Sequence, residues 1–209
     1  METRILADDH PGAIQEAAKA LAKGLLIVFP TDTLYGVGAD LQNPEALMRI
    51  YQAKVRPLEK GLPILVAKKD DLNQVVSQIP DDAVPLIEKF WPGPLTLILP
   101  KQSDLPAILS PNEGIAVRMP DNDIALKVIS AAGGAVAVSS ANMSGESPSC
   151  NAGQALKALG GLVSLIIDSG TVPIGRASTV VDCLGSPPRL LRQGPIPFDH
   201  ITNSLAVRS

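Results

Sequence analysis

The chain has 209 residues, of which 45% are hydrophobic and 19% charged, and its formal net charge is −3. This length and composition suit one domain with a substantial core. The slightly negative charge excludes a globally basic nucleic-acid binder but leaves a local basic cleft open. The two cysteines have no motif spacing, which excludes a disulfide framework and suits a reducing cytoplasm. Because no signal peptide and no apolar run of membrane-spanning length is recognisable, we expect a cytoplasmic protein without membrane contact.

Apolar periodicity, capping residues and prolines predict the elements in chain order. Helices are predicted at residues 11–22, 44–53, 70–79, 82–90, 123–132 and 151–159, with a weaker one at 198–205. Buried strands are predicted at residues 25–29, 62–67, 95–99, 115–119, 135–139, 162–167, 178–183 and 189–192. Residues 31–38 are predicted to form a polar loop. This alternation indicates an α/β fold on a largely buried sheet, and because nothing divides the composition we expect a single domain over residues 1–209.

Positive charge gathers between the second predicted helix and the strand that follows it. Lys54, Arg56 and Lys60 are offset locally by Glu59 alone. Pro57 disfavours the α region at Arg56, so the helix should end near Lys54. If the backbone there is extended, Lys54 and Arg56 project to the same side. Such a loop can be a phosphate clamp or simply a solvated basic loop.

Other polar side chains follow the ends of predicted strands, which is where ligands bind in α/β sheets. The Thr31–Gly36 segment offers hydroxyls that could bind a small polar ligand or satisfy a turn. Arg118 ends an apolar strand, so it needs either a structural ion pair or the carboxylate of a ligand. Two further groups could bind a ligand, or could serve as caps, turns or surface charges: Ser140 with Asn142, and Ser178 with Arg192.

The common catalytic signatures are absent from the sequence. There is no Gly-x-x-x-x-Gly-Lys-Ser/Thr loop, no third glycine after Gly36-Val37-Gly38, and no Gly-x-Ser-x-Gly elbow. The two histidines, His10 and His200, lie near the termini. A histidine-based triad or metal site is therefore not expected, and we assign no metal ligands.

Taken in order, several motifs resemble the YrdC-type family of threonylcarbamoyl-AMP synthases in its short, single-domain form. The motifs are Pro30–Gly38, Lys54–Leu62, Trp91–Thr96, Arg118–Pro120, Ser140–Gly145, Ser178–Asp182 and Arg192–Gly194. The resemblance covers residues from about 12 to 194 and leaves 195–209 as a C-terminal tail. It implies a YrdC-like twisted, open, mixed sheet with flanking helices around a concave basic cavity.

The resemblance also implies the reaction. L-threonine, bicarbonate and ATP would give threonylcarbamoyl-AMP and pyrophosphate, with Mg²⁺ accompanying ATP. The product would feed the threonylcarbamoyladenosine modification of tRNA, carried out by a downstream threonylcarbamoyltransferase machinery, and a weak tRNA contact is conceivable. Threonine's amine and bicarbonate form an anionic nucleophile, so the protein needs to supply positioning and charge neutralisation rather than a histidine base.

Residue roles follow from the same resemblance. Lys54 and Arg56 would be catalytic and face the nucleotide phosphates. ATP would contact Arg56, Lys60, Ser140, Asn142 and Arg192. L-threonine would contact Thr31, Thr33, Tyr35, Arg118 and Ser178, with Arg118 pairing its α-carboxylate.

Two departures from the longer relatives stand out. Leu65 occupies the position of their histidine, which leaves one threonine contact unassigned. Their closing loop has no obvious counterpart, although Glu146–Ser149 could partly cover the site.

Two other functions remain open. The first is a non-catalytic RNA-binding module on the same fold, against which the 3% aromatic content argues because few side chains could stack on bases. The second is a carbamoyl-adenylate former like that of hydrogenase maturation proteins, whose zinc-finger-like cysteines are absent here.

Overall fold

The computed structural model describes residues 2–206 and has the α/β class that the sequence predicts. Its strands are β1 (Arg4–Ala7), β2 (Ile27–Pro30), β3 (Tyr35–Asp40), β4 (Ile64–Val66), β5 (Leu95–Pro100), β6 (Gly114–Arg118), β7 (Ala135–Ser140), β8 (Leu165–Asp168), β9 (Thr179–Asp182) and β10 (Arg189–Arg192). In this part of the chain they form one open 10-stranded sheet, in the order β1-β8-β2-β3-β7-β4-β6-β5-β9-β10. The sheet is mixed, with parallel pairs β1–β8, β8–β2, β4–β6 and β5–β9 among antiparallel ones.

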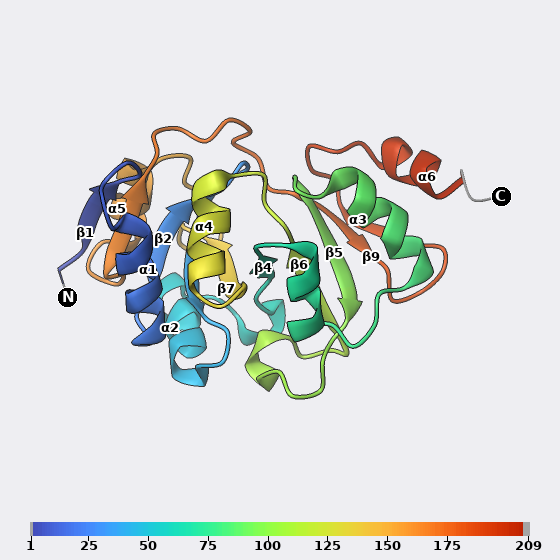
Figure 1. Ribbon diagram of the computed structural model, residues 1–209, viewed down its shortest axis with the longest axis horizontal. Coiled ribbons are helices and arrows are strands. Elements are labelled where there is room, and N and C mark those ends of the chain that lie inside the picture. Colours follow the sequence, from blue (N-terminus) through green and yellow to red (C-terminus); the bar gives the residue numbers. More distant parts are fainter. Residues whose placement is uncertain (1, 207–209) are drawn as a thin grey trace.

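The α-helices flank this sheet (Figure 1). They are α1 (Ala13–Ala22), α2 (Pro44–Lys54), α3 (Val84–Phe90), α4 (Asp123–Ala131), α5 (Ala152–Leu159) and α6 (Phe198–Ala206). Three of them begin at an asparagine whose side chain accepts a hydrogen bond from the first turn: Asn43, Asn122 and Asn151. These caps satisfy helix N–H groups that have no partner within the helix, which explains why the starts could be read from the sequence.

The two faces of the sheet carry separate apolar clusters. Along β7, Val136 and Val138 pack with α1 and α4, whereas Ala135 and Ala137 belong to the larger cluster that includes α2, α3 and α5. This alternation is the two-residue period of a strand. It makes nearly every residue of the central strands buried.

Helices α1 and α4 lie on one face of the sheet and cover only half of it. Their substantial contacts within residues 2–206 are with each other and with β2, β3, β8, β4 and β7. Strands β6, β5 and β9 have their opposite face in the larger cluster, through residues such as Leu97, Val117 and Val181. On the side of the sheet where α1 and α4 lie, these three strands are therefore not covered by the two helices, and they carry polar side chains and a cavity there.

Several sequence predictions are wrong in detail. The predicted loop 31–38 contains β3, and β1 was not predicted. Gly38 explains why β3 was not predicted, because glycine weakens strand propensity. The structure nevertheless needs a glycine here, since a Cβ would lie 2.9 Å from Cε1 of Phe29. The predicted helix 70–79 is a 3₁₀ helix at Lys69–Gln74, and the predicted helix 82–90 begins as a 3₁₀ turn at Asp81–Ala83. The weak C-terminal helix is confirmed as α6, which packs on α3. No helix among residues 2–206 is long and apolar enough to cross a membrane.

Candidate functional site

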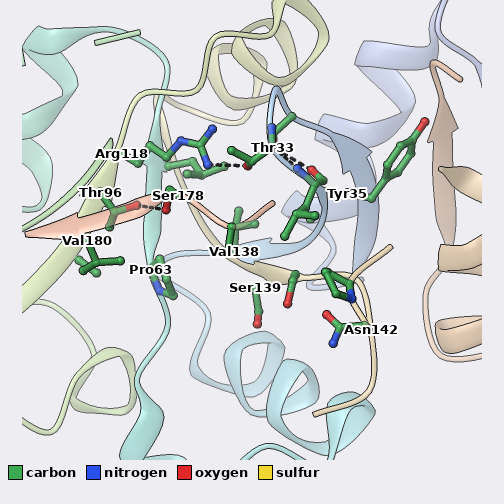
Figure 2. A pocket seen from close by; sticks show the side chains of 18 of the residues that line it. Thr33, Tyr35, Pro63, Thr96, Arg118, Val138, Ser139, Asn142, Ser178 and Val180 are labelled. Atoms are coloured by element: carbon green, nitrogen blue, oxygen red, sulfur yellow. Dashed lines mark hydrogen bonds between the residues drawn. The ribbon is translucent and has the colours of Figure 1, made fainter. Parts of the chain in front are cut away.

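A cavity of about 450 Å³ lies on the uncovered half of the sheet. Strand register sets its floor: Leu65 of β4 pairs with Arg118 of β6, and Thr96 of β5 pairs with Val180 of β9. Most of the predicted binding residues line this cavity, namely Thr31, Thr33, Tyr35, Arg56, Arg118, Ser140, Asn142, Ser178 and Arg192. Figure 2 shows Arg118, Thr33, Thr96 and Ser178 on one side of the cavity, facing Ser139 and Asn142 on the other.

Arg118 is held from three directions. Its Nη1 donates to Oγ1 of Thr33 at 2.7 Å and its Nε to the carbonyl of Gly93 at 2.9 Å, while its Nη2 forms an ion pair with Asp32. Burial lowers the pKa of Arg118, whereas the charge of Asp32 acts to raise it. The structural ion pair is therefore present, and because Arg118 also lines the cavity, its contact with the carboxylate of a ligand stays a prediction.

Two of the predicted threonine contacts have their hydroxyls engaged elsewhere. Thr31 closes a turn, because its Oγ1 donates to the carbonyl of Leu34 at 2.7 Å and accepts from the N–H of Leu34. The Tyr35 hydroxyl donates to the carbonyl of Gly170 at 2.8 Å and its ring points away from the cavity (Figure 2). Burial raises the pKa of Tyr35. Thr33 also lines the cavity, and its Oγ1 accepts from Arg118 and lies 3.0 Å from Oγ1 of Thr31.

A second pair of hydroxyls, those of Thr96 and Ser178, lies on the same side of the cavity as Arg118 (Figure 2). Oγ of Ser178 lies 2.7 Å from Oγ1 of Thr96. Arg192 donates to both the carbonyl and the Oγ of Ser178, at 3.0 and 3.2 Å. Arg192 is therefore oriented by Ser178.

The segment after β7 forms the facing wall. Nδ2 of Asn142 donates to the carbonyls of Met143 and Glu146, at 2.8 and 2.9 Å. Its Oδ1 is buried and has no hydrogen-bond partner in the described part of the protein. Glu146 and Pro148 also line the cavity, as expected for a segment that partly covers the site.

The basic loop departs from the predicted geometry. Helix α2 ends at Lys54 as expected, but Val55 has φ 50° and ψ 48°, the left-handed conformation. An extended Lys54–Arg56 segment is therefore a wrong prediction, because a left-handed residue at the helix end reverses the chain direction. Lys54 turns inward, where its Nζ donates to the carbonyls of Ser140 and Asn142, and Arg56 turns to the cavity.

Arg56 connects the main cavity to a second one of about 330 Å³, which it lines together with Lys60. Its Nη2 donates to the carbonyls of Lys60 and Gly61, at 2.7 and 2.9 Å. Burial lowers the pKa of Arg56. Lys60 borders the second cavity rather than the main one, and Glu59 and Asp182 line that second cavity as well.

The lining has a clear charge asymmetry. Three arginines, Arg56, Arg118 and Arg192, face one carboxylate, Glu146. A cavity of this kind attracts anions. Within residues 2–206 no group of three or more His, Cys, Asp or Glu residues could hold a metal ion.

Sequence reasoning missed Asp32 and Thr96, and it included Ser139 in a candidate polar stretch without giving it a role. Thr96 interrupts an apolar strand just as Arg118 does, so the same argument could have selected it. Asp32 and Ser139 adjoin predicted residues, but only the folded structure shows that Asp32 reaches Arg118 and that Ser139 lines the cavity.

Comparisons with known proteins identify the family of the chain. A family model named Sua5_yciO_yrdC, described as telomere recombination, matches residues 19–194. The threonylcarbamoyl-AMP synthase of Pyrococcus abyssi is 40% identical over 189 residues, which are 90% of this chain and 56% of that protein. A putative threonylcarbamoyl-AMP synthase of Mycobacterium tuberculosis is 37% identical over 93% of this chain and 89% of its own length. The chain thus spans little more than half of the archaeal relative and most of the mycobacterial one.

Solved structures show the same fold. The crystal structure of P. abyssi Sua5 complexed with L-threonine superposes with a TM-score of 0.92 at 37% identity, covering 98% of this chain and 61% of that one. Escherichia coli YciO superposes with a TM-score of 0.83 at 24% identity, covering 94% of this chain and 97% of that one. At this identity the likeness shows the fold alone. The chain therefore belongs to the Sua5/YciO/YrdC family.

Proposed function

We propose that this protein is a threonylcarbamoyl-AMP synthase, which converts L-threonine, bicarbonate and ATP into threonylcarbamoyl-AMP and pyrophosphate. The observation that carries the proposal is the cavity itself: three arginines and paired hydroxyls converge on the uncovered sheet face. A relative 37% identical over nearly the whole chain has been crystallised with L-threonine, which supports the same substrate here.

The proposed chemistry balances without a protein nucleophile. The threonine ammonium and bicarbonate give an N-carboxylate, one water and one proton. An oxygen of that carboxylate then attacks the α-phosphorus of ATP, and the bond to the bridging oxygen breaks to release pyrophosphate. Such a reaction depends on orienting two anions and neutralising their charge, which arginines and hydroxyl donors can do.

The described geometry suggests which part of the cavity holds each substrate. Threonine would lie at the Arg118 end, with its α-carboxylate on the guanidinium and the Thr33 and Ser178 hydroxyls beside it. ATP would extend past Arg56 toward Lys60, with Ser140, Asn142 and Arg192 around the phosphates. Among the described residues that line the cavity, Glu146 carries the only carboxylate, so Mg²⁺ would arrive as the ATP complex, held mainly by phosphate oxygens and water.

The product would pass to a downstream tRNA threonylcarbamoyltransferase machinery in the cytoplasm. Threonylcarbamoyl-AMP is a mixed anhydride and hydrolyses readily, so a partner that takes it up quickly would suit this chemistry. A weak tRNA contact near the cavity would serve the same purpose.

A product assay tests the proposal. Purified protein receives ATP, Mg²⁺, L-threonine and bicarbonate, and pyrophosphate release is followed together with mass spectrometry of the nucleotides. We expect an adduct that requires both threonine and bicarbonate. ATP binding without any adduct would contradict the proposal, and strongly salt-dependent tRNA binding without ATP binding would favour the RNA-binding alternative.

A further inference from the structure

Lys54 is a buried cation that lies behind the cavity wall rather than on it. The residue is 1% exposed and does not line the main cavity. Among the ion pairs of the described residues, none involves Lys54. Burying an ammonium without a carboxylate is costly, so its partners should reveal what the charge is for.

Those partners are backbone carbonyls of one short segment. Nζ of Lys54 donates to the carbonyl oxygens of Ser140 and Asn142. The carbonyl of Lys54 in turn accepts from the N–H of Ser144 at 2.9 Å. Three hydrogen bonds thus tie the end of α2 to the segment Ser140–Glu146, whose side chains Ser140, Asn142 and Glu146 line the cavity.

The two carbonyls explain why a cation is needed. The N–H of Asn142 donates to the carbonyl of Ser140 at 2.9 Å, so the chain turns tightly between them. Two carbonyl dipoles that point at one place repel each other unless a donor lies between them, and a charged donor gives the stronger bond. The left-handed Val55 lets Lys54 turn to these carbonyls while Arg56, two residues later, reaches the cavity.

We infer that Lys54 is a positioning residue: its ammonium holds Ser140–Glu146 in the shape that binds the nucleotide and does not itself contact the phosphates. The identity of the nucleotide as ATP rests on the proposed function. The effect on the segment does not depend on the proposed function, because it rests on hydrogen bonds within the chain.

Amide hydrogen exchange of the ligand-free protein is the first test. In Lys54→Met, which keeps the length of the side chain but loses the donor, we expect exchange across residues 140–146 to accelerate about tenfold or more. Lys23→Met is the matched control, since Lys23 is exposed at the end of α1. Unchanged protection of residues 140–146 in a folded Lys54→Met protein would overturn the inference.

Binding separates positioning from direct contact. We expect the Kd for Mg-ATP to rise about tenfold or more in Lys54→Met, while the Kd for L-threonine stays within about twofold. Weakened ATP binding together with native exchange rates would show direct phosphate contact and refute the positioning role. The two proposals can fail separately. If the wild-type protein made no threonylcarbamoyl-AMP but amide exchange across residues 140–146 still accelerated in Lys54→Met, the proposed function would be wrong and the positioning role of Lys54 would stand.

A wild-type measurement covers the case in which Lys54→Met does not fold. Amine-reactive labelling, read by mass spectrometry, should leave Lys54 unmodified both without and with ATP, whereas Lys23 reacts in both states. Labelling of Lys54 in the free protein that ATP prevents would place its ammonium on the cavity wall and overturn the inference.

Discussion

The two halves of one sheet face differ in what covers them. Beneath α1 and α4 the face is apolar and buried, with Phe29, Val136 and Ile167 among its fully buried residues. On β6, β5 and β9 the same side carries Arg118, Thr96 and Ser178 around a cavity. Leu65 and Val138 stand on the border, since they belong to the apolar cluster and also line the cavity.

The difference shows how one face of a sheet can complete the core in one half and form a binding site in the other. The opposite face of the sheet carries the larger apolar cluster, so the core is completed without the uncovered half. That half can therefore hold buried polar groups, provided that each finds a partner. Changes there should alter binding and catalysis, whereas changes under α1 and α4 should alter stability alone.

The largest expected effect tests whether the polar half also carries stability. Asp32→Ala leaves the buried guanidinium of Arg118 without its ion-pair partner. We expect the free energy of unfolding to fall by about 3–5 kcal/mol, as when one member of a buried pair is removed. Urea denaturation measures this loss, and a change below about 1 kcal/mol would mean that the pair is effectively solvated.

The next effect concerns catalysis without stability. Arg56→Ala should lower turnover by about 10²–10³-fold, as loss of one charge-stabilising donor commonly does, with the fold intact. The matched control is Arg4→Ala on β1. Arg4 forms an exposed ion pair with Glu16, and such a pair stabilises the fold by about 1 kcal/mol or less. Wild-type turnover in a folded Arg56→Ala protein would remove Arg56 from the site.

The Lys54 charge should appear in the pH dependence of stability. Burial, followed by the charge of Arg56, lowers the pKa of Lys54 from 10.5 to about 8. The unfolded chain then binds more protons between these values, so this group makes stability rise with pH from about 8 to 10.5, by about 3 kcal/mol in all. Denaturation across this range should show a shallower rise in Lys54→Met than in wild type, and parallel curves would contradict the buried charge.

The smallest effect tests the covered half. A Cβ at Gly38 would lie 2.9 Å from Cε1 of Phe29 and 3.2 Å from Cγ1 of Val136. We expect Gly38→Ala to cost about 1–3 kcal/mol through overpacking, with the Kd for L-threonine unchanged. Paired calorimetry and denaturation check this, and weaker threonine binding at native stability would mean that the two halves are coupled.

Local signals made part of this structure predictable. Asn43 and Asn122 mark helix starts because a cap acts on the backbone three residues away. The short strand β1 left no such signal, since it pairs with β8, which lies far away in the chain. Polar residues in the predicted loops and at strand ends were enough to find most of the polar side chains that line the cavity, but not to show that the Tyr35 hydroxyl binds Gly170.

The sequence by itself determined the α/β class, most helices and the basic character of the site, because periodicity, capping and charge act between near neighbours. Only the tertiary structure decided which polar groups meet. Arg118 finds Asp32 and Thr33 through strand register and loop packing, and Lys54 turns inward because one left-handed residue follows it. A strand's alternation defines two faces, but whether a face is covered by helices or left open depends on segments far away in the chain.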